Sequence, residues 1–318
     1  MPENSENFSA LIVVNPRSAN GALGRKWKRL ATVIRAHFGA FEHRFTASRG
    51  GATAIARQAL TDGRHEMVVA MGGDGTISEV VDGFFTDDGP VRPDAVLGIL
   101  PFGTGGDFRR TIGASRKLAR AAASLRGRDT RLIDAGLLRY TGHDGQQHVR
   151  HFVNIASFGI SGLVSQLANN TTKALGGKVT FALATLRAMR RFKPQRARLR
   201  LDGGEAQLVS LHTVAVANGR YFGGGMKIAP QAELEDGKFD VVTLGPLSWG
   251  DILLRSGRFY KGTHLELPQV THARAALVEA EPENPDEAIL LDVDGETPGR
   301  LPACFEVLPN ALRLKREA

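Results

Sequence analysis

The chain has 318 residues, which is long enough for two domains that each bury a core of their own. Its hydrophobic content of 42% and charged content of 23% are those of an ordinary soluble globular protein. Cys304 is the single cysteine, so a disulfide framework within the chain is excluded and a reducing compartment is indicated.

The net charge of +8 favours polyanionic partners such as nucleotides, nucleic acid or anionic lipid headgroups. Aromatic residues make up only 7% and are not interleaved with the arginines, which argues against a single-stranded nucleic-acid platform. The opening MPENSENFSA is polar, and the apolar runs fall far short of the roughly 20 residues that a membrane-spanning helix needs. We therefore expect a cytoplasmic protein, soluble or peripheral to a membrane.

The first part of the chain alternates predicted strands and helices. Apolar runs and helical spacing predict, in chain order, a strand at 10–14, a helix at 23–38, a strand at 41–46, a helix at 51–60, a strand at 67–71, a helix from Thr76, a strand at 95–100 and a helix at 116–125. Such alternation predicts an α/β domain, a parallel sheet with helices on both faces, whose ligands bind beyond the carboxyl ends of the strands. We place this domain at residues 1–133.

From about Ile133 the pattern changes to short strands separated by Gly, Asn and Asp turns. Predicted strands lie within 133–140, 150–159, 196–204, 207–219, 238–245 and 288–296, and one long helix is expected near 178–192. This pattern predicts a mostly antiparallel β domain over residues 134–302. A last strand is expected in the tail, and residues 303–318 are expected to return to the first domain.

A glycine-rich turn, Gly72-Gly73-Asp74-Gly75, follows the predicted strand at 67–71. Thr76 and Glu79 fit a capping box, with Thr76 as the N-cap of the next helix. A helix N-terminus offers free amides to an anion, and glycines allow phosphate oxygens to approach the backbone. Asp74 suits this setting if it holds Mg²⁺ or accepts a proton. A tight turn with an exposed aspartate is the simpler alternative.

Two further loops follow strands at the same expected edge of the sheet. They are VNPRSANG at 14–21 and LPFGTGGDFRRTIG at 100–113. Three such loops favour a nucleotide site, although none of them is a P-loop or a dinucleotide fingerprint.

VVNPRSANG, GGDGTISEVVDG, LGILPFGTGGDF and LDVDGE together resemble the catalytic domain of the diacylglycerol kinase and sphingosine kinase family, in its soluble bacterial lipid kinase branch. The resemblance runs along nearly the whole chain in the right order. It implies a nucleotide domain like that of NAD kinases, a C-terminal β-sandwich that takes the lipid, and ATP in the cleft between them. The implied reaction is transfer of the γ-phosphate to a lipid hydroxyl.

The resemblance also implies which residues contact the nucleotide or lie near it. Carried over motif by motif, they are Asn15, Thr46, Gly72, Gly73, Asp74, Gly75, Thr76, Gly103 and Thr104.

Asp74 and Asp107 would bind or orient the catalytic Mg²⁺ in such a kinase, while Asp294 and Glu296 would face the transferring phosphate. Glu296 is the expected base that takes the proton from the lipid hydroxyl. Asp74 is the alternative base, because the equivalent aspartate is favoured in the sphingosine kinase branch.

One position departs from the family pattern. The family usually has asparagine where this chain has Gly106, so an amide that could bond the base or fix the loop is missing, while Asp107 keeps its place. In the family, an Asp-Gly turn near residue 236 can hold a structural Mg²⁺, for which Asp236 and the carbonyls of Glu233 and Lys238 would be ligands. A plain hairpin turn is the alternative.

The segment 173–193 has six basic residues, no acidic residue and an apolar face at helical spacing. It is either a helix that settles on an anionic membrane or one that packs on the sandwich with its basic face in water. We expect a membrane lipid as substrate, peripheral contact with the inner face of an anionic membrane and no nucleic-acid partner. Whether the chain forms a homodimer stays open.

The sequence thus predicts an ATP- and Mg²⁺-dependent lipid kinase with a diacylglycerol-like acceptor. A ceramide, a sphingoid base or phosphatidylglycerol is an alternative acceptor. An NAD kinase shares the GGDGT turn but continues with an asparagine-and-glycine loop that is absent from LPFGTGGDFRR. A non-catalytic nucleotide- or lipid-binding regulator on the same fold is the alternative from another class.

Overall fold

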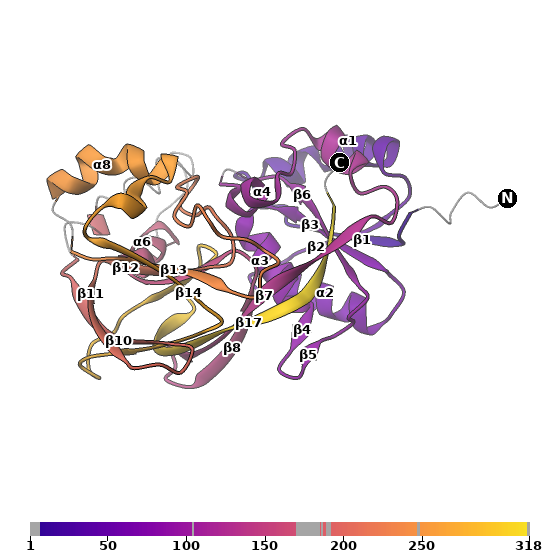
Figure 1. The fold of residues 1–318 in the computed structure, drawn as a ribbon. Helices are drawn as coiled ribbons and strands as arrows, with labels where there is room; N and C mark the ends of the chain where they lie inside the picture. The colour runs from indigo at the N-terminus through magenta and orange to yellow at the C-terminus, as the bar shows by residue number, and fades with distance from the viewer. Residues whose placement is uncertain are drawn as a thin grey trace. The chain divides into compact units, whose positions relative to one another are not determined.

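The structure is a computed structural model that describes residues 7–103, 105–169, 185, 187–188, 192–246 and 249–316. The chain divides into two compact units, drawn as a ribbon in Figure 1. The first comprises Met1–Asp134 and Asn310–Ala318, and the second Ala135–Pro309. The helix expected near 178–192 falls almost entirely outside the described residues, and so does Thr104.

The first unit is built on a parallel sheet. Its strands β1 (Ala10–Val14), β2 (Glu42–Phe45), β3 (Met67–Gly72) and β6 (Val96–Pro101) lie in the order β6-β3-β1-β2. The C-terminal end of β17 (Gly299–Lys315) pairs with β6, also in parallel. Every residue of β1 and β3 is buried, as expected for strands covered on both faces.

Helices cover this sheet. On one face, α1 (Ala22–His37) buries Trp27 and Ile34 in the same core as Ile12 and Val14, and α5 (Leu118–Ala123) adds its two buried alanines to that core. The helices α2 (Gly51–Thr61) and α3 (Asp74–Gly83) pack against each other and contact β1 and β3. In Figure 1, α1 and α2 lie on opposite sides of the strands. A short hairpin of β4 (Phe85–Thr86) and β5 (Gly89–Pro90) follows α3, and α4 (Asp107–Ile112) follows β6.

The predicted capping box is wrong. α3 begins at Asp74, and its N-cap is Gly73, three residues before Thr76. The Glu79 carboxylate instead accepts hydrogen bonds from the backbone N–H groups of Gly50 and Ala52, each at 3.0 Å, at the start of α2. Because the N-cap of α2 is a glycine without a side-chain acceptor, a carboxylate from the neighbouring helix supplies the cap.

The second unit holds two antiparallel sheets. One contains β14 (Val270–Ala275), β13 (Phe239–Leu244), β12 (Thr213–Ala217), β9 (Ile155–Gly159) and β16 (Leu291–Val293), in that order. The other contains β11 (Gln207–Leu211), β10 (Gln195–Leu201), β15 (Leu277–Pro282) and β17, with β7 (Thr130–Gly142) paired to β17 and to β8 (Gln147–Phe152). Helices α6 (Ile160–Asn169) and α8 (Trp249–Lys261) and a short 3₁₀ helix, η2 (His264–Glu266), complete its described elements.

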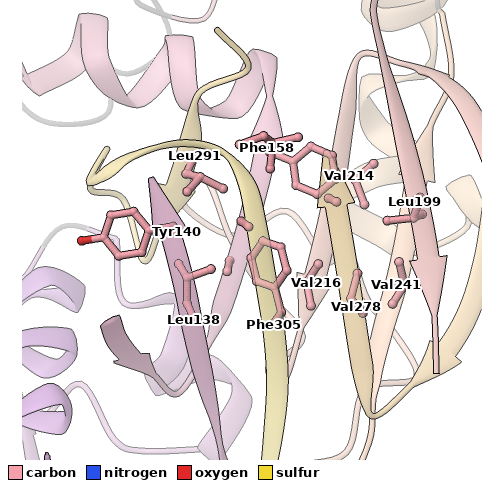
Figure 2. Close-up of a cluster of buried hydrophobic side chains, with 14 of the residues drawn as sticks. Leu138, Tyr140, Phe158, Leu199, Val214, Val216, Val241, Val278, Leu291 and Phe305 are labelled. Atoms are coloured by element: carbon pink, nitrogen blue, oxygen red, sulfur yellow. The ribbon is translucent and has the colours of Figure 1, made fainter. Parts of the chain in front are cut away.

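The inner faces of these sheets share one hydrophobic core, shown in Figure 2. Phe158, Val214 and Leu291 come from the first sheet and meet Leu199 and Phe305 of the second. Along β10 the buried side chains alternate with arginines that pair with glutamates at the surface, as expected for a strand with one buried face. The prediction of an α/β domain followed by an antiparallel β-sandwich is therefore confirmed. Among the described residues no helix has the length and apolar character needed to cross a membrane.

Candidate functional site

An open pocket of about 230 Å³ lies in the first unit, where β3 and β6 end. The parallel register pairs Gly72 with Pro101, so the loops that follow the two strands run side by side. Its lining comes from these loops, from α3 and α4 and from two neighbouring segments: Ala19, Gly72, Gly73, Asp74, Ile77, Pro101, Phe102, Gly103, Gly105, Gly106, Arg109 and Arg116. The pocket is thus at the sheet edge where ligands of parallel sheets bind.

The glycines are required because the two loops touch through their backbones. A Cβ on Gly103 would lie 2.5 Å from the Cα of Gly73, and one on Gly72 would lie 2.3 Å from Oγ1 of Thr76. The Phe102 N–H also donates to the Gly72 carbonyl at 2.7 Å. The glycines therefore allow close packing of the loops and leave a pocket wall made of backbone. The sequence indicated a close approach but did not reveal that the other loop makes it.

Asp74 fixes the second loop. Its Oδ2 accepts a hydrogen bond from the Gly106 N–H at 2.7 Å, and its Oδ1 accepts from Asp107 at 2.9 Å and Phe108 at 3.3 Å. Hydrogen bonds to an ionised acceptor are the stronger kind, so this carboxylate holds the loop in one conformation. Gly105 passes close by, since a Cβ there would lie 2.6 Å from Oδ2 of Asp74 and 4.0 Å from Oδ2 of Asp107.

Asp107 and Arg110 form a second tie in the same loop. Asp107 is buried, and its Oδ1 lies 2.8 Å from Nη1 of Arg110. The same guanidinium nitrogen donates to the carbonyls of Gly105 and Gly106 at 2.7 and 3.1 Å. The pair Asp74 and Asp107 thus brings two carboxylates to one glycine loop, together with the cation of Arg110.

The other predicted phosphate contacts surround the same strand ends. Asn15, after β1, donates from Nδ2 to Oγ1 of Thr76 at 3.0 Å and accepts from the Arg17 N–H at its Oδ1. Thr46, after β2, donates its N–H to the Val14 carbonyl. Of the predicted residues that the structure describes, Gly72, Gly73, Asp74 and Gly103 line the pocket, while Asn15, Thr46, Gly75, Thr76 and Asp107 lie outside its lining.

Asp294 and Glu296 belong to a tight hairpin turn in the second unit. Val293 and Glu296 exchange backbone hydrogen bonds of 2.8 and 3.0 Å, and Asp294 and Gly295 between them have φ of +50° and +88°. An Asp-Gly pair suits a turn with two positive φ angles. The Asp294 carboxylate accepts the Ile155 N–H at 3.0 Å, which fastens the turn to β9.

Glu296 and Asp292 point to different partners. Oε2 of Glu296 lies 2.9 Å from Nη1 of Arg150, and both side chains are mostly buried. Asp292 is 9% exposed and accepts the Gly295 N–H at 3.0 Å. Burial, together with the nearby charge of Asp294, raises the pKa of Asp292 to about 7. Sequence reasoning missed Arg150 and Asp292, since burial and ion pairing give no local signal.

Asp236 sits in the predicted turn of the second unit. Its Oδ1 accepts the Lys238 N–H at 3.0 Å, and its Oδ2 pairs with Arg274. These contacts fit a plain turn. Within the residues that the structure describes, no group of three or more His, Cys, Asp or Glu side chains could hold a metal ion. A structural Mg²⁺ at Asp236 therefore stays a prediction.

Comparison with known proteins assigns the family. Residues 9–138 match the diacylglycerol kinase catalytic domain, and residues 154–316 match the YegS C-terminal NAD kinase beta sandwich-like domain. A diacylglycerol kinase of Mycobacterium tuberculosis is 31% identical over 252 residues, which cover 79% of this chain and 77% of that protein. The chain belongs to the diacylglycerol kinase family. Membership of this family makes it a kinase, as predicted.

Other members of the diacylglycerol kinase family match almost end to end. A Bacillus subtilis diacylglycerol kinase is 28% identical over 302 residues, which cover 93% of this chain and 92% of that protein. A Bacillus anthracis structure assigned as a diacylglycerol kinase superposes with a TM-score of 0.76 at 25% identity, covering 99% of this chain and 98% of that one. The predicted resemblance is therefore confirmed along the whole chain.

Proposed function

We propose that this kinase transfers the γ-phosphate of ATP to the hydroxyl of a lipid, with Mg²⁺ bound and a diacylglycerol-like molecule as acceptor. The observation that carries the proposal is the backbone-walled pocket at the ends of β3 and β6, with Asp74 in its lining. Phosphoryl transfer depends on positioning and charge neutralisation more than on covalent chemistry. Glycine loops and carboxylates at a sheet edge are suited to both tasks.

The carboxylates of the first unit fit a nucleotide-bound Mg²⁺. This ion usually keeps several waters and takes only one or two carboxylates besides the phosphates. Asp74 and Asp107 both approach Gly105 although they follow different strands, so two such ligands are available beside one loop. When bound, the ion would neutralise charge on the phosphates, and these two residues would hold it.

Glu296 is the base that we favour. Both oxygens of Asp74 already accept backbone hydrogen bonds that order the glycine loop. Such a residue suits metal binding and loop positioning better than repeated proton exchange. Glu296 instead forms an ion pair with Arg150, which can orient the carboxylate. We assign to Glu296 the removal of the hydroxyl proton, and to Asp294 the positioning of the turn.

The names of the relatives support a diacylglycerol-like acceptor, since several of them are named diacylglycerol kinases. Another relative is named a probable YegS-like lipid kinase, which keeps phosphatidylglycerol, ceramide and sphingoid bases as alternative acceptors. The net charge of +8 supports peripheral contact with an anionic membrane at the cytoplasmic face. Co-sedimentation with phosphatidylglycerol vesicles tests that contact, and retention in the supernatant at low salt would refute it.

A phosphorylation assay tests the function. The purified chain is incubated with γ-labelled ATP, Mg²⁺ and mixed micelles that contain one candidate lipid each, and a parallel reaction contains NAD. We expect label in diacylglycerol and none in NAD. Label in NAD alone would show an NAD kinase, and ATP binding without any labelled acceptor would show a nucleotide-binding regulator.

A further inference from the structure

The pocket is also lined by two arginines that are not among the predicted site residues. Arg109 belongs to α4, and Arg116 lies between α4 and α5. Both share the pocket lining with Asp74 and with glycines of the two loops. Arg109 is half-buried, whereas Arg116 is exposed.

These arginines differ from their neighbour Arg110 in how their charge is balanced. Arg110 pairs with Asp107 at 2.8 Å. Within the described ranges, neither Arg109 nor Arg116 forms an ion pair with a carboxylate, and Nη1 of Arg109 donates a hydrogen bond to the Ala114 carbonyl at 2.9 Å. Because both guanidinium groups border one pocket, their like charges repel each other.

The charge of the pocket lining is positive as a result. Asp74 is its one carboxylate among the described residues, and three backbone N–H groups already bind its oxygens. The pocket lining thus carries two guanidinium groups and one carboxylate, and the oxygens of that carboxylate already accept backbone hydrogen bonds. Crowded cations of this kind are stabilised by a multivalent anion, and the planar guanidinium fork fits phosphate oxygens.

Building on the proposed function, we propose that Arg109 and Arg116 bind the phosphate chain of the donor nucleotide. In this arrangement Arg110 and Asp107 keep the loop in shape, while Arg109 and Arg116 contact the ligand. Mg²⁺ at the carboxylates and the two arginines would then share the charge of the triphosphate. The affinity contributed by the arginines must grow with the number of phosphates.

The test is equilibrium binding of ATP, ADP, AMP and adenosine by titration calorimetry in Mg²⁺. The variants are Arg109→Ala, Arg116→Ala and the double variant, with Arg29→Ala on the exposed face of α1 as a control of equal charge change. Each pocket variant should weaken ATP binding about tenfold, because a hydrogen bond to a charged group is lost. The loss should be smaller for ADP, smaller again for AMP and absent for adenosine, and Arg29→Ala should bind like the wild type.

Several outcomes separate this inference from the proposed function. Wild-type binding of ATP with an unchanged dissociation constant in the double variant would overturn the role of the arginines and leave the kinase intact. Equal losses for ATP and adenosine would show a structural role, which also overturns it. A wild-type chain that binds no ATP and labels no lipid would refute the proposed function itself.

The second single variant and a vesicle-binding measurement make the test decisive. If Arg109→Ala unfolds because it loses its bond to Ala114, Arg116→Ala still decides, since Arg116 is exposed and makes no side-chain hydrogen bond within the part of the chain that the structure describes. Binding to phosphatidylglycerol vesicles without nucleotide is measured for the same variants. Unchanged vesicle binding is expected, and a loss there with intact ATP binding would assign the arginines to a lipid headgroup and overturn the inference.

Discussion

Glu296 and Asp74 are the two carboxylates that we considered for the proposed base, and their surroundings differ. Asp74 binds backbone N–H groups and orders a loop, whereas Glu296 pairs with the Arg150 guanidinium. At the scale of single residues, these partners are the reason why we propose Glu296 as the base and Asp74 as a positioning group.

Replacing Glu296 should stop catalysis without preventing ATP binding. Glu296→Gln keeps the shape of the side chain but removes the proton acceptor, and we expect kcat to fall by roughly 10²–10⁴-fold. The measurement is the steady-state rate of lipid phosphorylation together with the dissociation constant for ATP. Glu283→Gln, which alters a surface ion pair with Arg196, is the control. A normal kcat in Glu296→Gln would show that another residue is the base.

Asp292 should make the stability of the protein depend on pH. In the unfolded chain this carboxyl ionises near pH 4, but in the folded protein it keeps its proton up to a pKa of about 7. Because the folded state binds the proton more tightly, ionisation favours unfolding increasingly as pH rises from about 4 to 7. Asp292→Asn removes this cost and retains an acceptor for the Gly295 N–H.

The urea midpoint of Asp292→Asn, minus that of the wild type, should therefore be larger at pH 8 than at pH 5. Taking the difference cancels the titration of all other groups. Asp88→Asn, at the exposed end of the β4–β5 hairpin, controls for the loss of a carboxylate. If the difference in urea midpoint between Asp292→Asn and the wild type is equal at both pH values, the pKa of Asp292 is not raised in the folded protein.

At the scale of elements, the loops after β3 and β6 act as one structure. Gly103 packs on Gly73, and Gly72 packs on Thr76, so an added methyl group has no room. Gly103→Ala should lower the free energy of unfolding by about 1–3 kcal/mol, as overpacking commonly does. ATP binding should weaken as well, because the pocket wall moves.

Gly257→Ala provides the matched control. Gly257 lies in α8 with an open space where its Cβ would be, so alanine should raise stability by about 0.5–1 kcal/mol through helix propensity. Chemical unfolding followed by circular dichroism checks both variants. A Gly103→Ala protein that unfolds and binds ATP like the wild type would refute the close packing of the loops.

The elements themselves were largely predictable from the sequence. Continuous apolar runs predicted β1, β3 and β6 because strands buried on both faces have no polar alternation. The role of Glu79 was not predictable, because its carboxylate caps α2, a helix that only tertiary packing brings near. For the same reason the sequence did not predict three further features: the arginines of the pocket, the ion pair of Arg150 with Glu296 and the burial of Asp292. Each depends on partners distant in the sequence or on burial.

At the scale of the whole molecule, two units of different architecture divide the proposed work. The first carries the pocket, Asp74 and Asp107, and the second carries Asp294 and Glu296. The family resemblance predicted this division of roles, whereas composition and periodicity predicted only the two architectures. The lipid acceptor could not be predicted, because apolar side chains alone do not specify one lipid headgroup.

Amide hydrogen exchange of the wild-type chain with and without MgATP tests the central claim most directly. We predict that nucleotide slows exchange in the glycine-rich loops after β3 and β6, whose residues Gly72, Gly73, Gly103, Gly105 and Gly106 line the pocket. Exchange along α8 should not change. A chain that phosphorylates lipid yet shows no nucleotide-dependent protection in these two loops would contradict the claim that they hold the triphosphate.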